Sequence, residues 1–167
     1  MKKRIAVIGL DDKLSKEVES MAERVGEDIA KADCILLCGG RGGVMEAACR
    51  GAKNAGGLTV GILPSLDVSE ANKHVDVAVT TGLGYARNSI VVSSADAVIA
   101  VNGSTGTLSE IGMALNFGKP VVVVEGSGGV ADKVKEAFPD DERVKRVVKV
   151  KAEESVKAAL AGISCSL

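Results

Sequence analysis

The sequence is poor in aromatic residues: its 167 residues include one Tyr, two Phe and no Trp. Proteins that bind single-stranded nucleic acid stack bases on aromatic rings, so this shortage argues against such a role. The charges also nearly cancel, with 21 Lys and Arg against 22 Asp and Glu. A duplex-binding face needs clustered cations that displace counterions. We therefore expect no nucleic-acid partner.

Long hydrophobic runs are also missing. The apolar run that follows the basic N-terminus ends at Asp11 and Asp12, which makes it too short for the core of a signal peptide. No segment approaches the ~18 consecutive apolar residues of a membrane span. We predict a cytoplasmic protein with no membrane partner.

Histidine and cysteine are scarce. The only histidine, His74, lies in a polar segment and is predicted to be solvated. Cys34 and Cys38 would lie in one strand with their Cα atoms about 13 Å apart, too far for a disulfide. Because no CxxC or paired-histidine spacing occurs, we predict no metal site. Together with Cys49 and Cys165, these cysteines are interpreted as buried structural thiols in a reducing compartment.

Glycine is the residue in excess, at 20 of 167 residues against an average usage of about 7%. The apolar fraction of 46% is ordinary and is carried by Val, Ile, Leu and Ala, so a packed core is expected. The length falls within the usual size of one domain, and we predict a single domain over residues 1–167. The glycine content predicts many tight turns.

Short runs of branched aliphatic residues alternate with amphipathic stretches of helical length. This alternation is typical of a parallel sheet covered by helices on both faces. The predicted strands are 4–8, 34–38, 59–63, 75–80, 97–101, 120–125 and 144–150. The predicted helices are 15–30, 44–55, 86–94, 107–117, 130–138 and 153–161. We therefore predict an α/β, doubly wound and mainly parallel sheet of about seven strands, which binds ligands beyond the carboxyl ends of its strands.

Glycine concentrates in four strand-to-helix turns, at residues 39–43, 82–84, 103–106 and 126–129. In the first of these, exposed amides and a helix N-terminus suit a phosphate, and Arg41 could add a bidentate contact. The alternative is a tight turn of purely structural glycines, with Glu46 and Arg50 as a surface pair. The candidate ligand contacts here are Gly39, Gly40, Arg41, Gly43 and Met45.

The turn VNGSTGTLSE, residues 101–110, adds hydroxyl groups to the same arrangement. It lacks the lysine of a Walker loop, and Asn102 replaces the first glycine of GxSxG with no histidine following it, so a serine hydrolase is not expected. Its candidate ligand contacts are Gly103, Ser104, Thr105, Gly106 and Thr107.

Glu110 has two interpretations. Thr107 and Glu110 fit a capping box, in which the glutamate bonds back to the start of its helix. Alternatively, a carboxylate in the first turn of a helix that opens onto a glycine-rich cleft can orient a water or stabilise a cationic sugar.

The turn GLGYARNSI, residues 82–90, places three further candidates at a helix start. Arg87 could neutralise a phosphate or a leaving group, and Tyr85 could pack against a planar ring. A basic residue at a helix N-terminus opposes the macrodipole, which favours a functional role for Arg87. Asn88 follows it as a candidate ligand contact.

These turns together resemble a Rossmann-like family that includes the LOG phosphoribohydrolases, often labelled "lysine decarboxylase-like", and the molybdenum cofactor carrier proteins. Residues 102–110 resemble the family motif PGGxGTxxE, with Asn102 in place of the proline and Ser104 in place of the second glycine. GGRGGVMEA resembles the earlier turn GGxxGxM, and Arg87 occupies the place of the family's arginine. The combination is closer to the short, carrier-like branch.

The resemblance implies hydrolysis of the N-glycosidic bond in nucleoside 5′-monophosphates. Glu110 would stabilise the oxocarbenium-like ribose or activate water, Arg87 would assist the leaving base, and residues 103–107 would hold the 5′-phosphate. No cofactor would be required. The resemblance also implies a homodimer or homotetramer, to which the apolar helix segment 111–117 could contribute.

The same resemblance supports an alternative, a non-catalytic carrier that holds a nucleotide or a molybdopterin-type ligand in the same cleft. Decarboxylation with pyridoxal phosphate is not expected. That chemistry needs a lysine in the cleft, whereas Lys119 is predicted at the opposite end of its strand.

Overall fold

Seven parallel strands form the sheet on which the molecule is built, and the computed structural model describes residues 1–165. The strand order is β4-β3-β2-β1-β5-β6-β7. The strands are β1 (Arg4–Gly9), β2 (Ile35–Cys38), β3 (Leu58–Leu63), β4 (Val77–Thr80), β5 (Ala97–Val101), β6 (Val121–Val124) and β7 (Val148–Val150). The central strands are buried runs of branched aliphatic residues, as a sheet covered on both faces requires.

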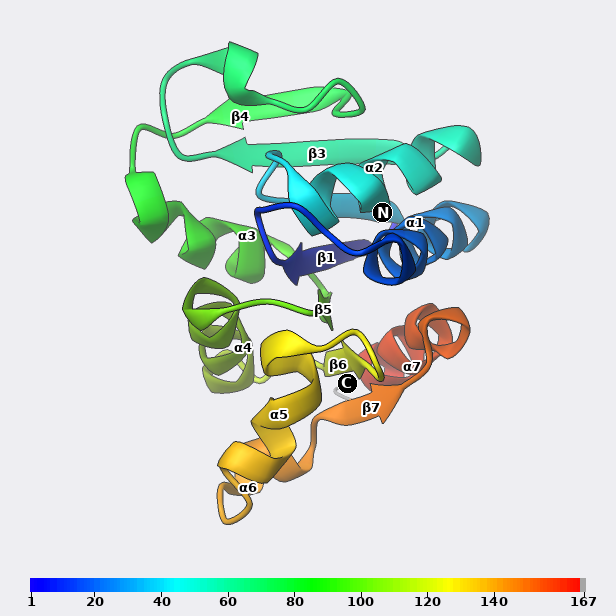
Figure 1. Ribbon diagram of the computed structural model, residues 1–167, viewed down its shortest axis with the longest axis vertical. Helices are drawn as coiled ribbons and strands as arrows, with labels where there is room; N and C mark the ends of the chain where they lie inside the picture. The colour runs from blue at the N-terminus through cyan, green and yellow to red at the C-terminus, as the bar shows by residue number, and fades with distance from the viewer. Residues whose placement is uncertain (166–167) are drawn as a thin grey trace.

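Helices cover both faces of the sheet (Figure 1). One face carries α1 (Lys16–Lys31), α2 (Gly43–Asn54) and α7 (Ala152–Cys165). The other carries α3 (Asn88–Ser94), α4 (Thr105–Asn116), α5 (Gly129–Ala137) and the short α6 (Glu142–Lys145). Two 3-10 turns, η1 (Val68–Glu70) and η2 (Gly84–Arg87), flank β4. The predicted α/β, Rossmann-like, doubly wound fold is confirmed.

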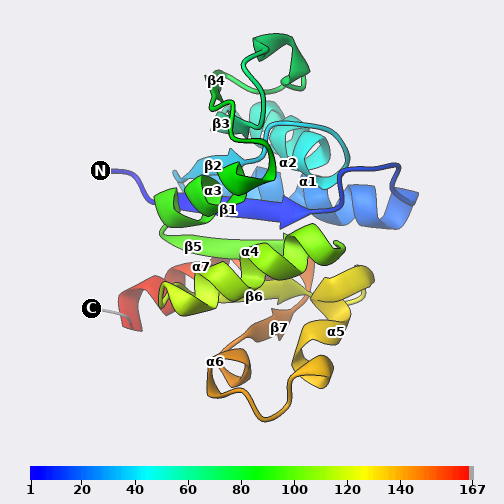
Figure 2. The same ribbon diagram turned by 90° about the vertical axis from the view of Figure 1, so that its left-hand side faces the viewer.

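The chain changes direction between β1 and β5. It first builds outward from β1 to β4 and then returns through η2 and α3 to place β5 beside β1. Figure 2 shows the carboxyl ends of these two neighbours close to the start of α4. In doubly wound sheets such a reversal leaves a crevice at the carboxyl ends of the strands. A ligand site is therefore expected at this position.

The predicted strand 144–150 is too long, since only Val148–Val150 form β7 and Val144 belongs to α6. The carboxylate of Asp141 accepts the backbone N–H groups of Arg143 and Val144, which caps a helical turn and overrides the β-propensity of valine. The predicted strand 75–80 likewise begins only at Val77.

Two predictions about single residue types need correction. Cys34, Cys38 and Cys49 are buried free thiols as predicted, but Cys165 is exposed. Cys34 also lies just before β2, while Cys38 packs against α2, with its Sγ 3.6 Å from that of Cys49. His74 is not fully solvated: it is half-buried, and its Nε2 is buried without a hydrogen-bond partner among the described residues.

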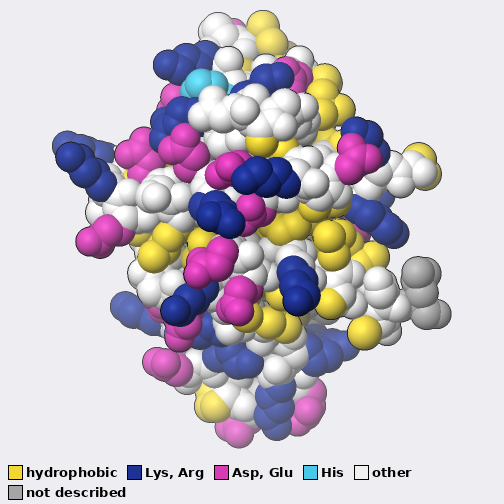
Figure 3. Space-filling model, turned by 90° about the vertical axis from the view of Figure 1, so that its right-hand side faces the viewer, with side chains coloured by type: hydrophobic (Ala, Val, Ile, Leu, Met, Phe, Trp, Pro, Cys, Tyr) yellow, Lys and Arg dark blue, Asp and Glu magenta, His cyan; other side chains and the backbone are white. Residues whose placement is uncertain are grey.

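Neither a membrane span nor a metal cluster is found in residues 1–165. None of the helices there combines the length and the apolar character needed to cross a bilayer. These residues also contain no group of three His, Cys, Asp or Glu side chains placed to hold a metal ion. Figure 3 shows acidic and basic side chains interspersed on one face of the molecule.

Two glycines allow α1 and α2 to pack closely. A Cβ atom on Gly26 would lie 1.9 Å from the carbonyl oxygen of Ala48, and one on Gly51 would lie 1.9 Å from the carbonyl oxygen of Glu23. Both distances are far below van der Waals contact, and both obstacles are backbone atoms. The close packing of α1 on α2 therefore requires glycine at both positions.

We predict that Gly51→Ala lowers the free energy of unfolding by about 2 kcal/mol, because the two helices must separate. Gly112→Ala is the matched control. A Cβ at Gly112, in α4, meets no atom within 4 Å, so the higher helix propensity of alanine should raise the free energy of unfolding by about 0.5–1 kcal/mol. Urea denaturation measures both. Equal effects of the two substitutions would contradict the close packing of α1 on α2.

Candidate functional site

A cleft of about 1040 Å³ opens at the carboxyl ends of β1 and β5. Its walls come from the turn after β1, the starts of α2 and α4, and the segment from η2 into α3. Of the residues predicted from the sequence, those in its lining are Arg41, Met45, Tyr85, Arg87, Asn88, Ser104, Thr105, Gly106, Thr107 and Glu110. One cleft thus brings together parts of three predicted turns that are distant in the sequence.

Arg87 and Glu110 form the most buried charged pair of the cleft. Arg87 ends η2 and is 9% exposed, while Glu110 lies in the second turn of α4 and is 6% exposed. Arg87 Nη1 lies 3.8 Å from Glu110 Oε1, longer than a hydrogen bond, and Arg87 Nε has no hydrogen-bond partner among the described residues. The hydrogen-bonding capacity of both groups is therefore incompletely used within the protein.

Burial dominates the electrostatics of this pair. It raises the pKa of Glu110 from its ordinary 4.5 to about 7, although the positive charge of Arg87 opposes the shift. Burial also lowers the pKa of the Arg87 guanidinium, and the Glu110 carboxylate opposes that change. A carboxyl group that titrates near neutrality can take up and release a proton under working conditions, which suits acid–base chemistry.

The capping-box interpretation of Glu110 is wrong. The helix begins at Thr105, two residues earlier than predicted, so Thr107 stands inside its first turn. The Glu110 carboxylate lies beside Arg87 in the cleft. Ser104 is the N-cap but makes no side-chain capping bond, and the first amides of a helix have no partners within it. The start of α4 thus offers unused donors and a positive helix end to the cleft.

Asn102 fixes the turn that leads into α4. Its backbone is left-handed, with φ 56°, a conformation that asparagine tolerates and that proline, with φ near −65°, cannot adopt. Its side-chain amide donates to the carbonyl of Ser127 at 2.7 Å, and the Ser127 hydroxyl accepts its backbone N–H at 2.8 Å. The glycine-rich turn at 126–129 therefore supports the neighbouring turn instead of lining the cleft.

The glycines after β2 make room for neighbouring groups. A Cβ on Gly39 would lie 2.4 Å from Arg87 Nη2, and one on Gly43 would lie 2.1 Å from the carbonyl oxygen of Leu10. The N–H of Gly42 donates to Asp11 Oδ1 at 3.0 Å, so a carboxylate of the protein already occupies the N-terminus of α2. Gly39, Gly40, Gly43 and Gly103 lie behind the cleft lining, packed against other parts of the chain.

The surface pair considered for α2 is also absent. Arg50 binds Glu19 and Glu23 of α1, at 2.6 and 3.2 Å, and not Glu46. Glu46 therefore has no part in holding Arg50, which ties α2 to α1.

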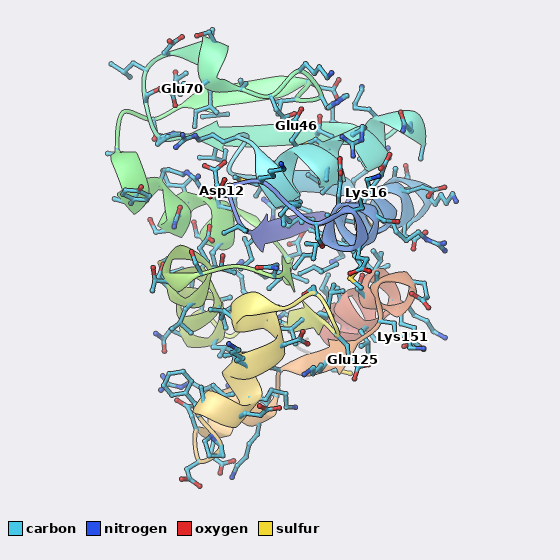
Figure 4. All side chains as sticks on the ribbon, in the orientation of Figure 1. Asp12, Lys16, Glu46, Glu70, Glu125 and Lys151 are labelled. Carbon is cyan, nitrogen blue, oxygen red and sulfur yellow. The ribbon has the colours of Figure 1, made fainter. Side chains whose placement is uncertain are left out.

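Sequence reasoning missed the turn after β1. Asp11 and Asp12 line the cleft together with Gly9 and Leu10, and Figure 4 shows Asp12 in this turn, near the start of α2. The predicted fold already indicates a role for this turn, because β1 is the first strand of a doubly wound sheet and the turn after it borders the point of reversal. The remaining cleft residues that were not predicted include Pro64, Ser89, Ser109 and Met113.

Comparisons with known proteins show the family of the chain. A model of the SLOG cluster4 family matches residues 2–159. The solved molybdenum cofactor binding protein of Rippkaea orientalis is 37% identical, with 98% of each chain covered and a TM-score of 0.88. The molybdenum cofactor carrier protein MCP of Chlamydomonas reinhardtii is 34% identical, with 99% of each chain covered and a TM-score of 0.84. The predicted LOG-like family, with a branch similar to molybdenum cofactor carriers, is confirmed.

An enzyme is also among the relatives. The cytokinin riboside 5′-monophosphate phosphoribohydrolase of Mycobacterium tuberculosis is 32% identical over 118 residues. The matched region is 65% of this chain and 63% of the enzyme, so the chain spans less than two thirds of that relative's length.

We predict that the carboxyl carbon of Glu110 titrates near pH 7 in NMR spectra of the folded protein. In Arg87→Met the midpoint should rise further, because the cation that favours the ionised form is gone while the site stays buried. A midpoint near 4.5 in the unsubstituted protein would contradict the burial of this carboxyl group.

The same group predicts a pH dependence of stability. The unfolded chain releases this proton near pH 4.5 and the folded chain near pH 7, so the contribution of Glu110 to stability is lost as the pH rises through that window. Relative to Glu110→Gln, the unsubstituted protein should lose up to about 3 kcal/mol between pH 4.5 and 7. Denaturant titrations of both proteins across this range measure the difference, and a constant difference would overturn the prediction.

Gly39→Ala should displace the Arg87 guanidinium, since the new methyl group would occupy its place. We expect weaker binding of phosphorylated ligands without loss of the fold, because the obstacle is the end of a side chain and not backbone. Gly112→Ala is the control, since its Cβ meets no atom within 4 Å and the position lies outside the cleft lining. Ligand binding is measured by calorimetry and the fold by circular dichroism. Equal binding by the two variants would contradict the role of Gly39.

Proposed function

The chain belongs to the SLOG cluster4 family, and on this premise we propose that it binds a phosphorylated, nucleotide-like small molecule and hydrolyses the N-glycosidic bond of a nucleoside 5′-monophosphate. The observation that carries the proposal is the Arg87–Glu110 pair. Both residues are more than nine-tenths buried, both line the cleft, and their donors and acceptors are incompletely used. A pair with only a structural role would be expected to close into a shorter, fully bonded contact.

The start of α4 is the proposed phosphate site. The amides of its first turn, the hydroxyls of Ser104 and Thr105, and the helix macrodipole all favour an anion there.

The proposed reaction breaks the bond between C1′ of the ribose and the nitrogen of the base. Glu110 as a carboxylate removes a proton from the attacking water or stabilises the positive charge that develops on the ribose. The water oxygen bonds to C1′, and the base leaves with the bonding electrons and takes up a proton. Arg87 stabilises the negative charge that develops on the leaving base. The products are the free base and ribose 5-phosphate.

A second candidate function is a carrier that holds a pterin phosphate in the same cleft without cleaving it. The observation that favours the carrier is the share of each relative that aligns with this chain. The two molybdenum cofactor proteins align over 98% or more of their length, whereas the phosphoribohydrolase aligns over 63% of its length. Neither candidate requires a further cofactor.

We further propose a cytoplasmic homo-oligomer, a homodimer or a homotetramer. Within segment 111–117, Ile111 and Leu115 are buried in the core of the subunit, whereas Phe117 is 51% exposed. Any contribution of this segment to an interface would therefore come from its outer face.

The hydrolase is tested by incubating the protein with AMP, CMP, GMP and IMP and measuring free base and ribose 5-phosphate. We predict that Glu110→Gln and Arg87→Met each lower kcat/KM by about 100-fold or more, as expected for loss of an acid–base group or of charge stabilisation. Glu70→Gln on η1 and Arg146→Met are the matched controls, because both positions are exposed and outside the cleft.

Release of no base from any of these nucleotides, together with tight binding, would reject the hydrolase and favour the carrier. A molybdopterin chromophore that co-purifies with the protein and is lost in Arg87→Met would support the carrier directly.

A further inference from the structure

Asp11 and Arg41 have no role in the proposed chemistry, yet both line the cleft. They come from two neighbouring turns, after β1 and after β2. Backbone contacts fix both positions, since Asp11 Oδ1 accepts the N–H of Gly42 at 3.0 Å and the side-chain amide of Asn72 donates to the carbonyl of Arg41 at 2.8 Å. The cleft therefore presents a cation and a carboxylate at a defined place.

The two side chains are only loosely paired. Arg41 Nε lies 3.4 Å from Asp11 Oδ2, longer than the roughly 2.7–2.9 Å of a well-formed charge-assisted hydrogen bond. The side chains of Arg41 and Asp11 are 44% and 36% exposed. The guanidinium thus has free donors, and Oδ2 has a free acceptor site, side by side on the cleft surface.

The part of the cleft beside Asp11 disfavours an anion. The Asp11 carboxylate already occupies the N-terminus of α2, and Asp12 adds a second negative charge in the same turn. The phosphate is therefore placed at the start of α4, which lines the same cleft and has no acidic residue in its first turn. The part of the ligand beside Asp11 is consequently its uncharged end, the ring.

We propose that Arg41 and Asp11 select a ring edge that carries a carbonyl, a ring N–H and an amino group in a row. Arg41 donates to the carbonyl oxygen, and Asp11 accepts from the ring N–H and the amino group. Guanine and pterin share this edge, so the proposed ligands are GMP-like nucleotides or pterin phosphates. The inference rests on the proposed function, because it takes the N-terminal start of α4 as the phosphate site.

Other bases fit this pair less well. Adenine presents an amino group and an unprotonated ring nitrogen, which would place a donor against Arg41 and a lone pair against Asp11. Hypoxanthine keeps the carbonyl and the N–H but lacks the amino group, so it loses one bond to a carboxylate. A missing bond of this kind typically lowers affinity about tenfold.

The test is calorimetric binding of GMP, IMP, AMP and 6-hydroxymethylpterin phosphate to the unsubstituted protein, Asp11→Asn and Asp12→Asn. Asparagine keeps an oxygen for the N–H of Gly42 and removes the charge that receives the two ring donors. Asp12 is the matched control, since it stands in the same turn and its Oδ1 accepts the adjacent N–H of Lys13. If the protein hydrolyses the nucleotides, ratios of kcat/KM replace ratios of Kd.

We expect GMP, the pterin phosphate or both to bind at least about tenfold more tightly than IMP and AMP. The tighter binder of GMP and the pterin phosphate shows whether the ring of the ligand is a guanine or a pterin. In Asp11→Asn this preference should fall to about one, because GMP gives up two bonds to the carboxylate and IMP gives up one. In Asp12→Asn the preference should persist.

Equal affinity of the unsubstituted protein for all four ligands, or a preference that survives Asp11→Asn, would overturn the inference and leave the proposed function standing. Failure of every phosphorylated ligand to bind would reject both.

Discussion

The site is organised by two opposite charges taken out of water, Arg87 and Glu110. Burying such a pair costs desolvation energy, which a long contact of 3.8 Å recovers only in part. The cost is visible in the raised pKa of Glu110 and in the unpartnered Nε of Arg87. Much of the surrounding chain can be understood as the structure that holds these two groups in place at the reversal point of the sheet.

The glycine excess follows largely from this constraint and from close packing. Gly39 leaves space for the guanidinium, Gly43 admits the turn after β1, and Gly129 admits the turn that leads into α4. In each case the position a Cβ would take is filled by another part of the protein, not by a ligand. A glycine-rich turn whose sequence suggests a phosphate site can therefore make room for a neighbouring loop instead. The start of α4, with its unused amides, is the proposed anion site.

The strands were predictable where a run of branched aliphatic residues is buried on both faces, as in β5 and β6. Prediction failed where a local hydrogen bond decides the structure, because valines near Val144 suit a strand as well as a helix until the Asp141 carboxylate caps the turn. The pairing of Arg87 with Glu110 came from the family resemblance, since no spacing rule links two turns that are distant in sequence. Asp11 was missed because a carboxylate in a polar turn usually faces solvent, and only the fold shows that it accepts the N–H of Gly42 at the start of α2 and lines the cleft.

A hydrolase and a carrier require different properties of the buried pair of Arg87 and Glu110. A carrier needs Arg87 for the charge of its ligand, but it gains nothing from a carboxyl group held near neutrality, because an ionised Glu110 repels a phosphate and a protonated one weakens the hold on Arg87. A hydrolase gains from the same property, since the group can exchange a proton in each turnover at a pKa close to the working pH. The desolvation of Glu110 is therefore easier to explain by bond cleavage than by storage, and this is the physical reason for placing the hydrolase first.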